Sequence, residues 1–388
     1  MEIYEPREDS FMIAKEIRAF ATGKVLDMGT GSGILAREAS KTAEEVIALD
    51  INKDAVKEAS QIARFKGIKN ITFRQSDLFS YFKDNNQRFD LIIFNPPYLP
   101  EDKAEPKESA LATTGGKKGY ELLEKFFEKA SEHLLPFGKI LVLFSSLTGK
   151  DKVHNIIETY GFNFQKLAEE HFFQETLFVY LAEKSDLLRS LEGKNIKNIK
   201  RLAKGHRGLI FTGKLGKKKV AIKKQREDIT AIGRIDNEAR WLKVLNRKNI
   251  GPKFLFMDDS YFVYEFVEGE FFPKYIETAK KQEIKKVILD ILKQCFILDK
   301  RGINKEEMHH PYKHILVNKK PVLIDFERTH VTEKPQNVTQ FCQYITSGNI
   351  KNKLKDFKLN KTDITQAAKK YKEDISEKTF KNILKLIR

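Results

Sequence analysis

The hydrophobic positions in the first half of the chain form short apolar runs, and amphipathic stretches separate most of them. The runs expected to be strands are residues 24–28, 46–49, 71–73, 89–94, 139–144 and 177–182, and helical spacing is found at 11–20, after residue 34 and at 120–135. Strands that alternate with helices build a mostly parallel sheet with helices on its faces. We therefore predict an α/β domain with a Rossmann-like, seven-stranded sheet over residues 1–184.

In the second half, strand-like runs come first and helical spacing dominates later. The expected strands are residues 209–212, 220–223, 261–267, 315–317 and 322–324, with a helix at 236–245. The basic stretch at 185–201 is expected to be a linker or a leading helix. The pattern predicts a separate α+β domain over residues 185–388.

A glycine-rich turn follows the first strand of the first domain. Gly29 and Gly31 lie in this turn, and Asp50 ends the next strand. Glycines let the backbone turn sharply and approach a ligand without a Cβ in the way. An acidic residue at the end of the second strand can accept hydrogen bonds from both ribose hydroxyls. Together they predict a cofactor that contains adenosine, with the carboxylate of Asp77 available to an adenine amino group.

The strand at 89–94 ends in Asn95, Pro96, Pro97 and Tyr98. Consecutive prolines fix the backbone and remove two donors, so Asn95 is held in a rigid turn at the carboxyl end of a strand. The Asn95 side chain and the Pro96 carbonyl can accept hydrogen bonds from an amino or amide nitrogen, and Tyr98 can stack on its planar group. This arrangement orients the nitrogen lone pair for attack on a methyl group. It therefore predicts methyl transfer to nitrogen without a strong base.

The DMGTGSG turn, Asp50 and the NPPY motif together resemble class I S-adenosylmethionine-dependent N-methyltransferases, and the opening YEPREDSF resembles their HemK-like branch. That branch, in its archaeal and eukaryotic form, methylates a glutamine of translation release factors and commonly needs a small activator subunit. The resemblance implies a cofactor site at Asp27, Gly29, Gly31, Asp50, Asp77 and Asn95, with Asn95, Pro96 and Tyr98 at the acceptor nitrogen. Methyltransferases that act on nucleic-acid bases share this motif, so a base remains an alternative acceptor. The glycines at 115–119 predict either a lid over the substrate or a plain surface loop.

Charge separates the two halves. The chain has a formal net charge of +17. Residues 1–184 contain 25 Lys and Arg against 29 Asp and Glu, and residues 185–388 contain 46 against 25. The net charges are therefore −4 and +21, so a polyanion is expected to bind the second half. Residues 350–388 add a lysine-rich, helically spaced stretch that predicts either a solvated helix face or a phosphate-binding surface.

The second half contains residues in the order found in protein kinases. A glycine-containing hairpin precedes the Val-Ala-Ile-Lys sequence that ends at Lys223, and Glu238 follows in a helix. In kinases such a lysine contacts ATP phosphates and pairs with a helix glutamate. Glu265 lies in the strand that would meet adenine, and Asp325 begins an Asp-Phe-Glu sequence where Mg²⁺ would bind. We predict an ATP-binding, kinase-like fold.

The expected catalytic loop departs from the kinase pattern. Counted back from residues 315–317, the positions of the catalytic Asp and the metal-binding Asn hold His309 and His314. Histidine can act as a base near neutral pH, but it is a poor ligand for Mg²⁺. His309, Lys313 and His314 are therefore candidates for contact with the acceptor, with His314 a doubtful Mg²⁺ ligand. Packing or turn roles without chemistry remain the alternative for the histidines.

The sequences EEMHHPYKHILV, VLIDFER and PQNVTQF resemble archaeal RIO- and Bud32-like kinases, over residues 195–345. That group includes a tRNA kinase that phosphorylates a ribose 2′-hydroxyl. The resemblance implies a bifunctional enzyme that uses S-adenosylmethionine, ATP and Mg²⁺, with RNA, specifically tRNA, as the partner of the second half. A RIO-type protein Ser/Thr kinase and a non-catalytic RNA-binding module are the alternatives.

Two cysteines and no CxxC pair make a disulfide framework or a structural zinc site improbable. No uncharged run approaches the ~20 residues that cross a bilayer. The expectation is a cytoplasmic protein with no membrane partner.

Overall fold

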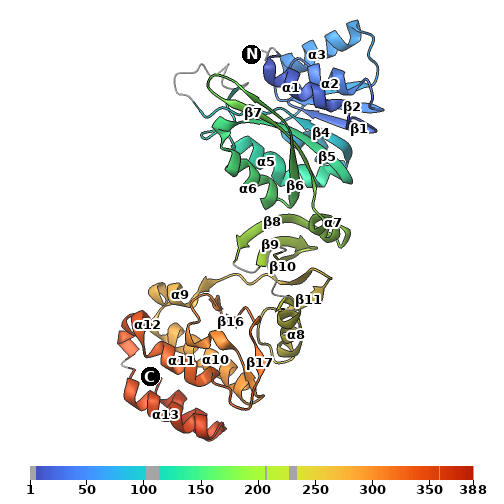
Figure 1. Cartoon of the computed structure of the whole chain (residues 1–388). Helices are drawn as coiled ribbons and strands as arrows, with labels where there is room; N and C mark the ends of the chain where they lie inside the picture. Colours follow the sequence, from blue (N-terminus) through green and yellow to red (C-terminus); the bar gives the residue numbers. More distant parts are fainter. Residues whose placement is uncertain (1–5, 102–112, 206–207, 227–233, 358, 388) are drawn as a thin grey trace. The chain divides into compact units, whose positions relative to one another are not determined.

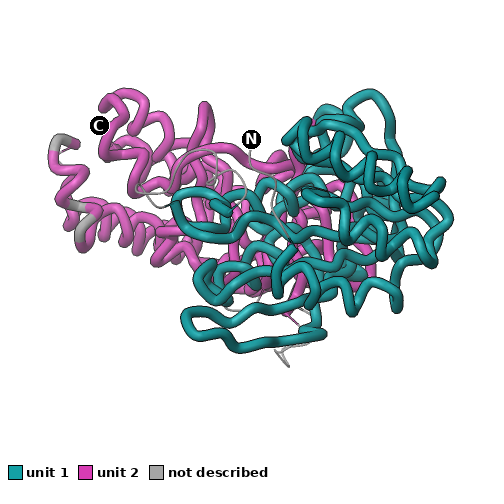
Figure 2. The backbone as a smooth tube through the Cα atoms, turned by 90° about the horizontal axis from the view of Figure 1, so that it is seen from above, with its two compact units in different colours: residues 1–202, 212–217 teal, residues 203–211, 218–388 magenta. Residues whose placement is uncertain are grey.

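The computed structural model describes residues 6–101, 113–205, 208–226, 234–357 and 359–387. Its chain divides into two compact units, coloured separately in Figure 2: residues 1–202 with 212–217, and residues 203–211 with 218–388. Each unit has its own hydrophobic core. The boundary predicted at residue 184 is the last residue of strand β7, whereas the first unit extends to residue 202 and also includes residues 212–217.

The first unit contains a seven-stranded sheet in the order β3-β2-β1-β4-β5-β7-β6. Its strands are β1 (Lys24–Met28), β2 (Glu45–Asp50), β3 (Ile71–Gln75), β4 (Phe89–Phe94), β5 (Leu134–Ser145), β6 (Phe162–His171) and β7 (Thr176–Lys184). The pairs from β3 to β5 are parallel, and β7 is antiparallel to both β5 and β6. The predicted Rossmann-like, mostly parallel sheet is confirmed. The sheet order reverses at β1, with β2 on one side and β4 on the other, and such a switch point is where ligands bind.

Helices cover both faces of this sheet, with α1, α2 and α3 on one face and α5 and α6 on the other (Figure 1). The bounds of these helices are α1 (Glu8–Ile17), α2 (Ile34–Ala39), α3 (Lys53–Phe65), α5 (Glu121–Ala130) and α6 (Lys150–Thr159). A further helix, α7 (Asp186–Gly193), follows β7. Short 3₁₀ turns are η1 (Leu78–Phe82), η2 (Ser131–His133) and η3 (Ser146–Thr148). The helix expected over 120–135 is shorter because η2 follows it and β5 already begins at Leu134.

The chain beyond the seven-stranded sheet forms smaller sheets. A five-stranded sheet has the order β11-β12-β10-β9-β8, a three-stranded sheet the order β13-β15-β16, and β14 pairs with β17. The strands are β8 (Ile196–Lys204), β9 (Gly208–Leu215), β10 (Lys218–Gln225), β11 (Phe254–Met257), β12 (Tyr261–Glu265), β13 (Glu270–Phe271), β14 (Ile303–Asn304), β15 (Ile315–Val317), β16 (Pro321–Leu323) and β17 (His330–Val331). The linker or helix expected over 185–201 is wrong beyond α7, because residues from Ile196 onward form β8, with Ile196 and Ile199 buried.

Helices dominate the rest of the second unit. They are α8 (Arg234–Asn246), α9 (Phe272–Thr278), α10 (Lys281–Asp299), α11 (Asn337–Ile345), α12 (Gly348–Lys353), α13 (Lys361–Glu373) and α14 (Glu377–Lys385), with 3₁₀ turns η4 (Glu306–His309) and η5 (Lys355–Phe357). The terminal helices are amphipathic, as their spacing predicts. Ile364, Tyr371 and Phe380 belong to the buried core, so the lysines occupy the opposite, exposed side. No helix in the described ranges is long and apolar enough to cross a membrane.

Candidate active site

A cavity of about 810 Å³ lies at the carboxyl ends of β1, β2 and β4 in the first unit. Among the residues that line it are Asp9, Gly29, Gly31, Asp50, Asp77, Asn95, Pro96, Tyr98, Gly115, Phe172 and Glu175. Of the predicted cofactor and acceptor residues in this half, all except Asp27 line this one cavity.

The glycine-rich turn holds its shape through left-handed backbone angles and a carboxylate. Gly29 and Gly31 have φ angles of 71° and 51°, which other residues rarely adopt. Asp50 accepts hydrogen bonds from the backbone N–H groups of Gly31 and Asn52, both at 2.8 Å. Burial raises the pKa of Asp50 above its ordinary value. The carboxylate thus fixes the turn and also lines the cavity.

Asp27 lies beneath the turn rather than on the cavity wall. Its side chain is fully buried, and its Oδ2 accepts hydrogen bonds from Thr30 Oγ1 at 2.6 Å and from the Ala36 N–H at 3.0 Å. Burial raises the pKa of Asp27 to about 7. The contacts with Thr30 and Ala36 make Asp27 a support for the turn and for the start of α2.

The two polar ends of the Asn95 amide differ in their hydrogen bonding. Its Nδ2 donates a hydrogen bond of 2.8 Å to Asp9 Oδ2, and its buried Oδ1 has no hydrogen-bond partner in the described chain. Asp9 lies in α1 and is only 4% exposed. Because the amide nitrogen is occupied by Asp9, the amide oxygen remains as an acceptor at the cavity.

Tyr98 and the glycine-rich stretch at 115–119 lie beside this turn. Burial, with the nearby Asp9 carboxylate, raises the pKa of Tyr98, so its hydroxyl stays protonated. The Gly115 N–H bonds to the Leu99 carbonyl at 2.9 Å. A Cβ on Gly115 would lie 2.6 Å from the Pro97 carbonyl oxygen, so the two segments require a glycine here. The predicted loop position is correct, and the lid function stays a prediction.

Asp77 begins η1 at another part of the cavity wall. Its side chain and that of Ser80 form reciprocal hydrogen bonds with backbone N–H groups across the first turn. The carboxylate is therefore held in place at the end of β3, where the sequence predicts a contact with adenine.

Comparison with known proteins identifies the first unit. Residues 20–177 match the family model described as a methyltransferase domain. A candidate protein N5-glutamine methyltransferase of Methanocaldococcus jannaschii is 38% identical over 164 residues, which cover 42% of this chain and 81% of that protein. The chain belongs to the protein glutamine methyltransferase family.

Other members of this glutamine methyltransferase family are more distant. A release factor glutamine methyltransferase of Thermodesulfovibrio yellowstonii is 34% identical over 149 residues, covering 36% of this chain and 52% of that protein. The chain spans 40–52% of this and two other bacterial relatives. The structure of the E. cuniculi Mtq2-Trm112 complex matches 48% of this chain and 100% of the solved chain at 26% identity, with a TM-score of 0.38.

The cavity of the methyltransferase domain suits S-adenosylmethionine, the methyl donor of the family. Gly29 leaves its surroundings open, since a Cβ added at this residue would meet only Phe94 within 4 Å, at 3.9 Å. Asp50 and Asp77 line the cavity with carboxylates suited to hydroxyl and amino groups, and Asn95, whose side-chain oxygen has no partner in the described chain, lines it too. The residues that line the cavity therefore fit S-adenosylmethionine.

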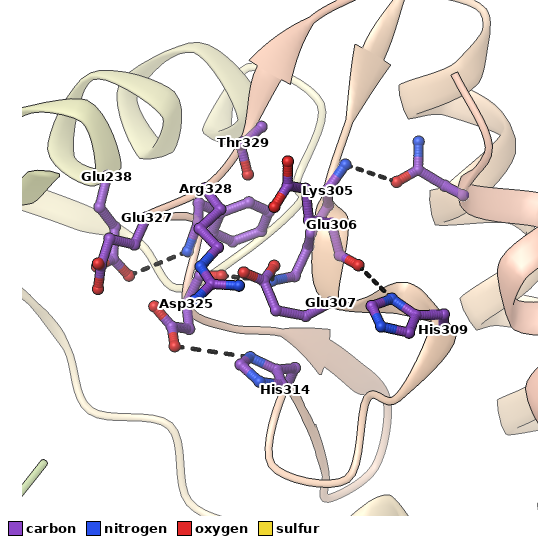
Figure 3. A network of polar contacts seen from close by, with 12 residues as sticks. Glu238, Lys305, Glu306, Glu307, His309, His314, Asp325, Glu327, Arg328 and Thr329 are labelled. Atoms are coloured by element: carbon purple, nitrogen blue, oxygen red, sulfur yellow. Dashed lines mark hydrogen bonds and ion pairs between the residues drawn. The ribbon is translucent and has the colours of Figure 1, made fainter. Parts of the chain in front are cut away.

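A second polar cluster lies in the second unit, and Figure 3 shows Glu238, Lys305, Glu307 and Asp325 of it. Lys223 Nζ lies 2.5 Å from Glu238 Oε2 and 3.1 Å from Asp325 Oδ1. Burial acts to lower the pKa of Lys223, but these two carboxylates outweigh it and raise the pKa. Burial acts to raise the pKa of Asp325, but the ammonium groups of Lys223 and Lys305 hold it below its ordinary value. The predicted lysine, glutamate and aspartate thus meet in one centre.

The other residues predicted in this half lie at different distances from the centre. His314 Nδ1 is 3.6 Å from Asp325 Oδ2. His309 is exposed and its Nδ1 lies 2.6 Å from the Glu306 carbonyl. Lys313 is also exposed. In the described part of the chain, neither His309 nor Lys313 contacts Lys223 or Asp325.

Glu265 is the last residue of β12. Its backbone N–H donates to the Lys253 carbonyl at 2.8 Å, and its carboxylate lies 2.6 Å from Lys218 Nζ. The side chain is therefore engaged at the sheet surface, and the contact of Glu265 with adenine stays a prediction.

Two residues at these sites were not selected from the sequence. Asp9 belongs to the YEPREDSF segment, so a signal for it existed, but its contact with Asn95 spans 86 residues. Glu307 lies in the loop between β14 and β15, where counting by kinase spacing points to His309. Only the folded chain places Lys305 between Glu307 and Asp325.

Proposed function

We propose that the first unit transfers a methyl group from S-adenosylmethionine to the side-chain amide nitrogen of a protein glutamine. The observation that carries this proposal is the orientation of Asn95, whose nitrogen is held by Asp9 and whose buried oxygen is unpartnered. An acceptor of hydrogen bonds at this place suits an NH₂ group better than an oxygen nucleophile.

The chain's own residues orient the acceptor. Asn95 Oδ1 and the Pro96 carbonyl accept the two N–H groups, and Tyr98 packs against the plane of the amide. These contacts direct the nitrogen lone pair toward the donor, while Asp50 and Asp77 hold the ribose and adenine. S-Adenosylmethionine supplies an electrophilic methyl group, so positioning and the exclusion of water contribute most of the rate enhancement.

A protein substrate is supported by the surface at the cavity rim. Phe172 lines the cavity, and the adjacent Phe173 is 100% exposed between β6 and β7. The net charge of −4 for residues 1–184 does not favour a nucleic acid at this unit. We infer a release factor as the substrate, with a nucleic-acid base as the weaker alternative.

A small activator subunit is part of this proposal. The edge of the sheet at β3 offers a place for it, and Phe65 at the end of the neighbouring helix α3 is 93% exposed. An exposed sheet edge beside an apolar side chain is suited to a partner that adds a strand.

Asn95→Ala tests the assignment in the full chain with its activator. Methyl transfer to a purified release factor should fall at least ~100-fold, while binding of S-adenosylmethionine changes less than about threefold. Unchanged transfer would refute the role of Asn95. Transfer to tRNA with none to the release factor would refute the glutamine substrate.

We also infer a second function, an ATP-dependent kinase over residues 185–388, from the contacts of Lys223 with Glu238 and Asp325. The charge of +21 supports a tRNA ribose 2′-hydroxyl as the acceptor. Lys223 would contact the phosphates, the Glu265 backbone would meet adenine, and Asp325 would hold Mg²⁺, which neutralises phosphate charge. This carboxylate is ionised and 37% exposed, so it fits a hard cation, whereas the His314 nitrogen is a poor ligand.

Asp325→Ala separates the kinase from its alternatives. Loss of phosphotransfer with unchanged tRNA affinity would support the kinase and exclude a non-catalytic RNA-binding module. Labelling of protein instead of tRNA by γ-³²P-ATP would favour a protein Ser/Thr kinase. Both proposed reactions use substrates of the cytoplasm, where we place the protein.

A further inference from the structure

The loop between β14 and β15 is anchored from below by buried polar contacts. The Lys305 N–H donates to Asn337 Oδ1 at 2.8 Å, and Asn337 in turn contacts Asp299. β14 pairs with β17 through Ile303 and Val331, so the start of this loop runs beside the segment that follows Asp325. The backbone at Lys305 is therefore fixed next to the Lys223 centre.

The Lys305 side chain links this loop to the centre. Its ammonium group is fully buried, donates to the Asp325 carbonyl oxygen and lies 2.9 Å from Glu307 Oε2. The Glu307 side chain is 13% exposed, so solvent reaches it only in part. Figure 3 shows the Glu307 carboxylate directed toward Asp325, with Lys305 behind it.

The predicted base, His309, is directed elsewhere. Its ring contacts the Glu306 carbonyl and the ring of His310. In Figure 3 it lies on the far side of Glu306 and Glu307 from Asp325. Between His309 and Glu307, it is thus Glu307 that is held at the centre, where His314 also lies with its Nδ1 3.6 Å from Asp325 Oδ2.

We propose that Glu307 is the catalytic base of the second unit. This inference rests on the proposed kinase function. Glu307 accepts the proton of the acceptor hydroxyl as its oxygen forms a bond to the γ-phosphorus of ATP. The bond from that phosphorus to the β,γ-bridging oxygen breaks, ADP leaves, and Glu307 returns the proton to water. Lys305 positions Glu307 and compensates for its charge.

The experiment uses the full chain with γ-³²P-ATP, Mg²⁺ and total tRNA, and compares Glu307→Gln with Glu306→Gln and His309→Ala. Glutamine keeps the length of Glu307 and can still bond to Lys305, but it cannot accept a proton. We expect Glu307→Gln to lower kcat at least ~100-fold with an unchanged KM for ATP, and the two controls to stay within about threefold. Binding of a fluorescent ATP analogue, measured separately, should be unchanged in all variants.

The outcomes distinguish the inference from the function on which it rests. Wild-type transfer that Glu307→Gln retains would overturn the role of Glu307 alone. A fall in ATP binding parallel to the fall in kcat would also overturn it, since a base does not contribute to nucleotide affinity. Absence of wild-type transfer to tRNA, protein and water would remove the kinase function itself. Formate should partly restore transfer in Glu307→Ala if the missing group is a base.

Discussion

At the residue scale, the proposed methyl acceptor site depends on the orientation of the Asn95 amide. The two ends of the Asn95 side chain differ only in whether they donate or accept, and the Asp9 carboxylate resolves this difference because it can only accept. The buried Asp9 carboxylate in α1 thus holds the amide nitrogen and leaves the amide oxygen without a partner in the described chain. In the proposed function, Asp9 acts through Asn95 as a positioning residue.

We expect Asp9→Asn to impair catalysis without loss of the fold. The asparagine can present its own NH₂ group to Asn95, which allows the Asn95 amide to turn and removes the acceptor from the cavity. The kcat for methyl transfer should fall ~10- to 100-fold, with binding of S-adenosylmethionine little changed, as measured by isothermal titration calorimetry. Glu16→Gln in the same helix is the control and should leave kcat for methyl transfer nearly unchanged. An equal loss of cofactor affinity would contradict a positioning role.

Asp27 gives a prediction about pH. Its folded-state pKa of about 7 lies above the ordinary value of 3.8, so the folded protein holds a proton that the unfolded chain releases. The stabilisation from this protonation is fully present below pH ~4 and is lost as pH rises toward 7, on the order of 4 kcal/mol at most. Urea denaturation at several pH values should show a flatter profile for Asp27→Asn in this window. Parallel profiles for the variant and the wild type would contradict the raised pKa.

At the element scale, the sequence predicts the buried strands well and the exposed ones poorly. β1 and β4 are continuous apolar runs, and their positions match the prediction. β6 and β8 alternate with lysines and glutamates and lie at sheet edges, so neither has an apolar run. Pairing with a neighbour, which no local pattern records, makes them strands.

The residues of the candidate sites also differ in whether the sequence predicts them. Residues within a local motif, such as Gly31, Asn95 and Lys223, could be selected because spacing along the chain places them. Asp9 and Glu307 owe their positions to contacts between distant segments. Kinase spacing points to His309, whose ring lies at the Glu306 carbonyl at the end of η4, so its catalytic role stays a prediction.

The glycine-rich segment beside the NPPY turn yields a prediction at this scale. In Gly115→Ala, the new Cβ would lie 2.6 Å from the Pro97 carbonyl oxygen and 2.4 Å from the Gly119 carbonyl oxygen, so backbone must move. We expect kcat for methyl transfer to fall ~10-fold or more, because the turn that carries Asn95 shifts. Gly67→Ala, where no atom lies within 4 Å, controls for loss of glycine, although its positive φ adds strain of its own. Full activity in Gly115→Ala would show that the two segments are not coupled.

At the scale of the whole molecule, the charge of the two halves supports different proposed partners. Residues 185–388 have a net charge of +21, and the terminal helices expose lysines such as Lys369 and Lys370. Because their apolar sides are buried in the core, these helices present a fixed array of charge.

This array predicts a salt-dependent affinity for tRNA. The logarithm of the association constant should fall linearly with the logarithm of salt concentration, with a slope of about −3 or steeper, as for about four neutralised phosphates. Fluorescence anisotropy with labelled tRNA measures the slope. Changing Lys369 and Lys370 together to Gln should make the slope less steep by ~1 to 2 units if the terminal helices contact phosphates. A slope near zero would contradict RNA as the partner.

The hydrogen bond between Asp9 and Asn95 also bears on the dynamics of the methyltransferase domain. It joins α1 to a strand end 86 residues later, so the proposed acceptor site is complete only while α1 is docked. Single helices can undock from a domain by local unfolding. Transient undocking of α1 would therefore prevent binding of the acceptor. The glycine-rich turn, held by Asp50, would continue to bind the cofactor. Amide hydrogen exchange in α1 would then report how often the enzyme is loaded but unable to select its substrate.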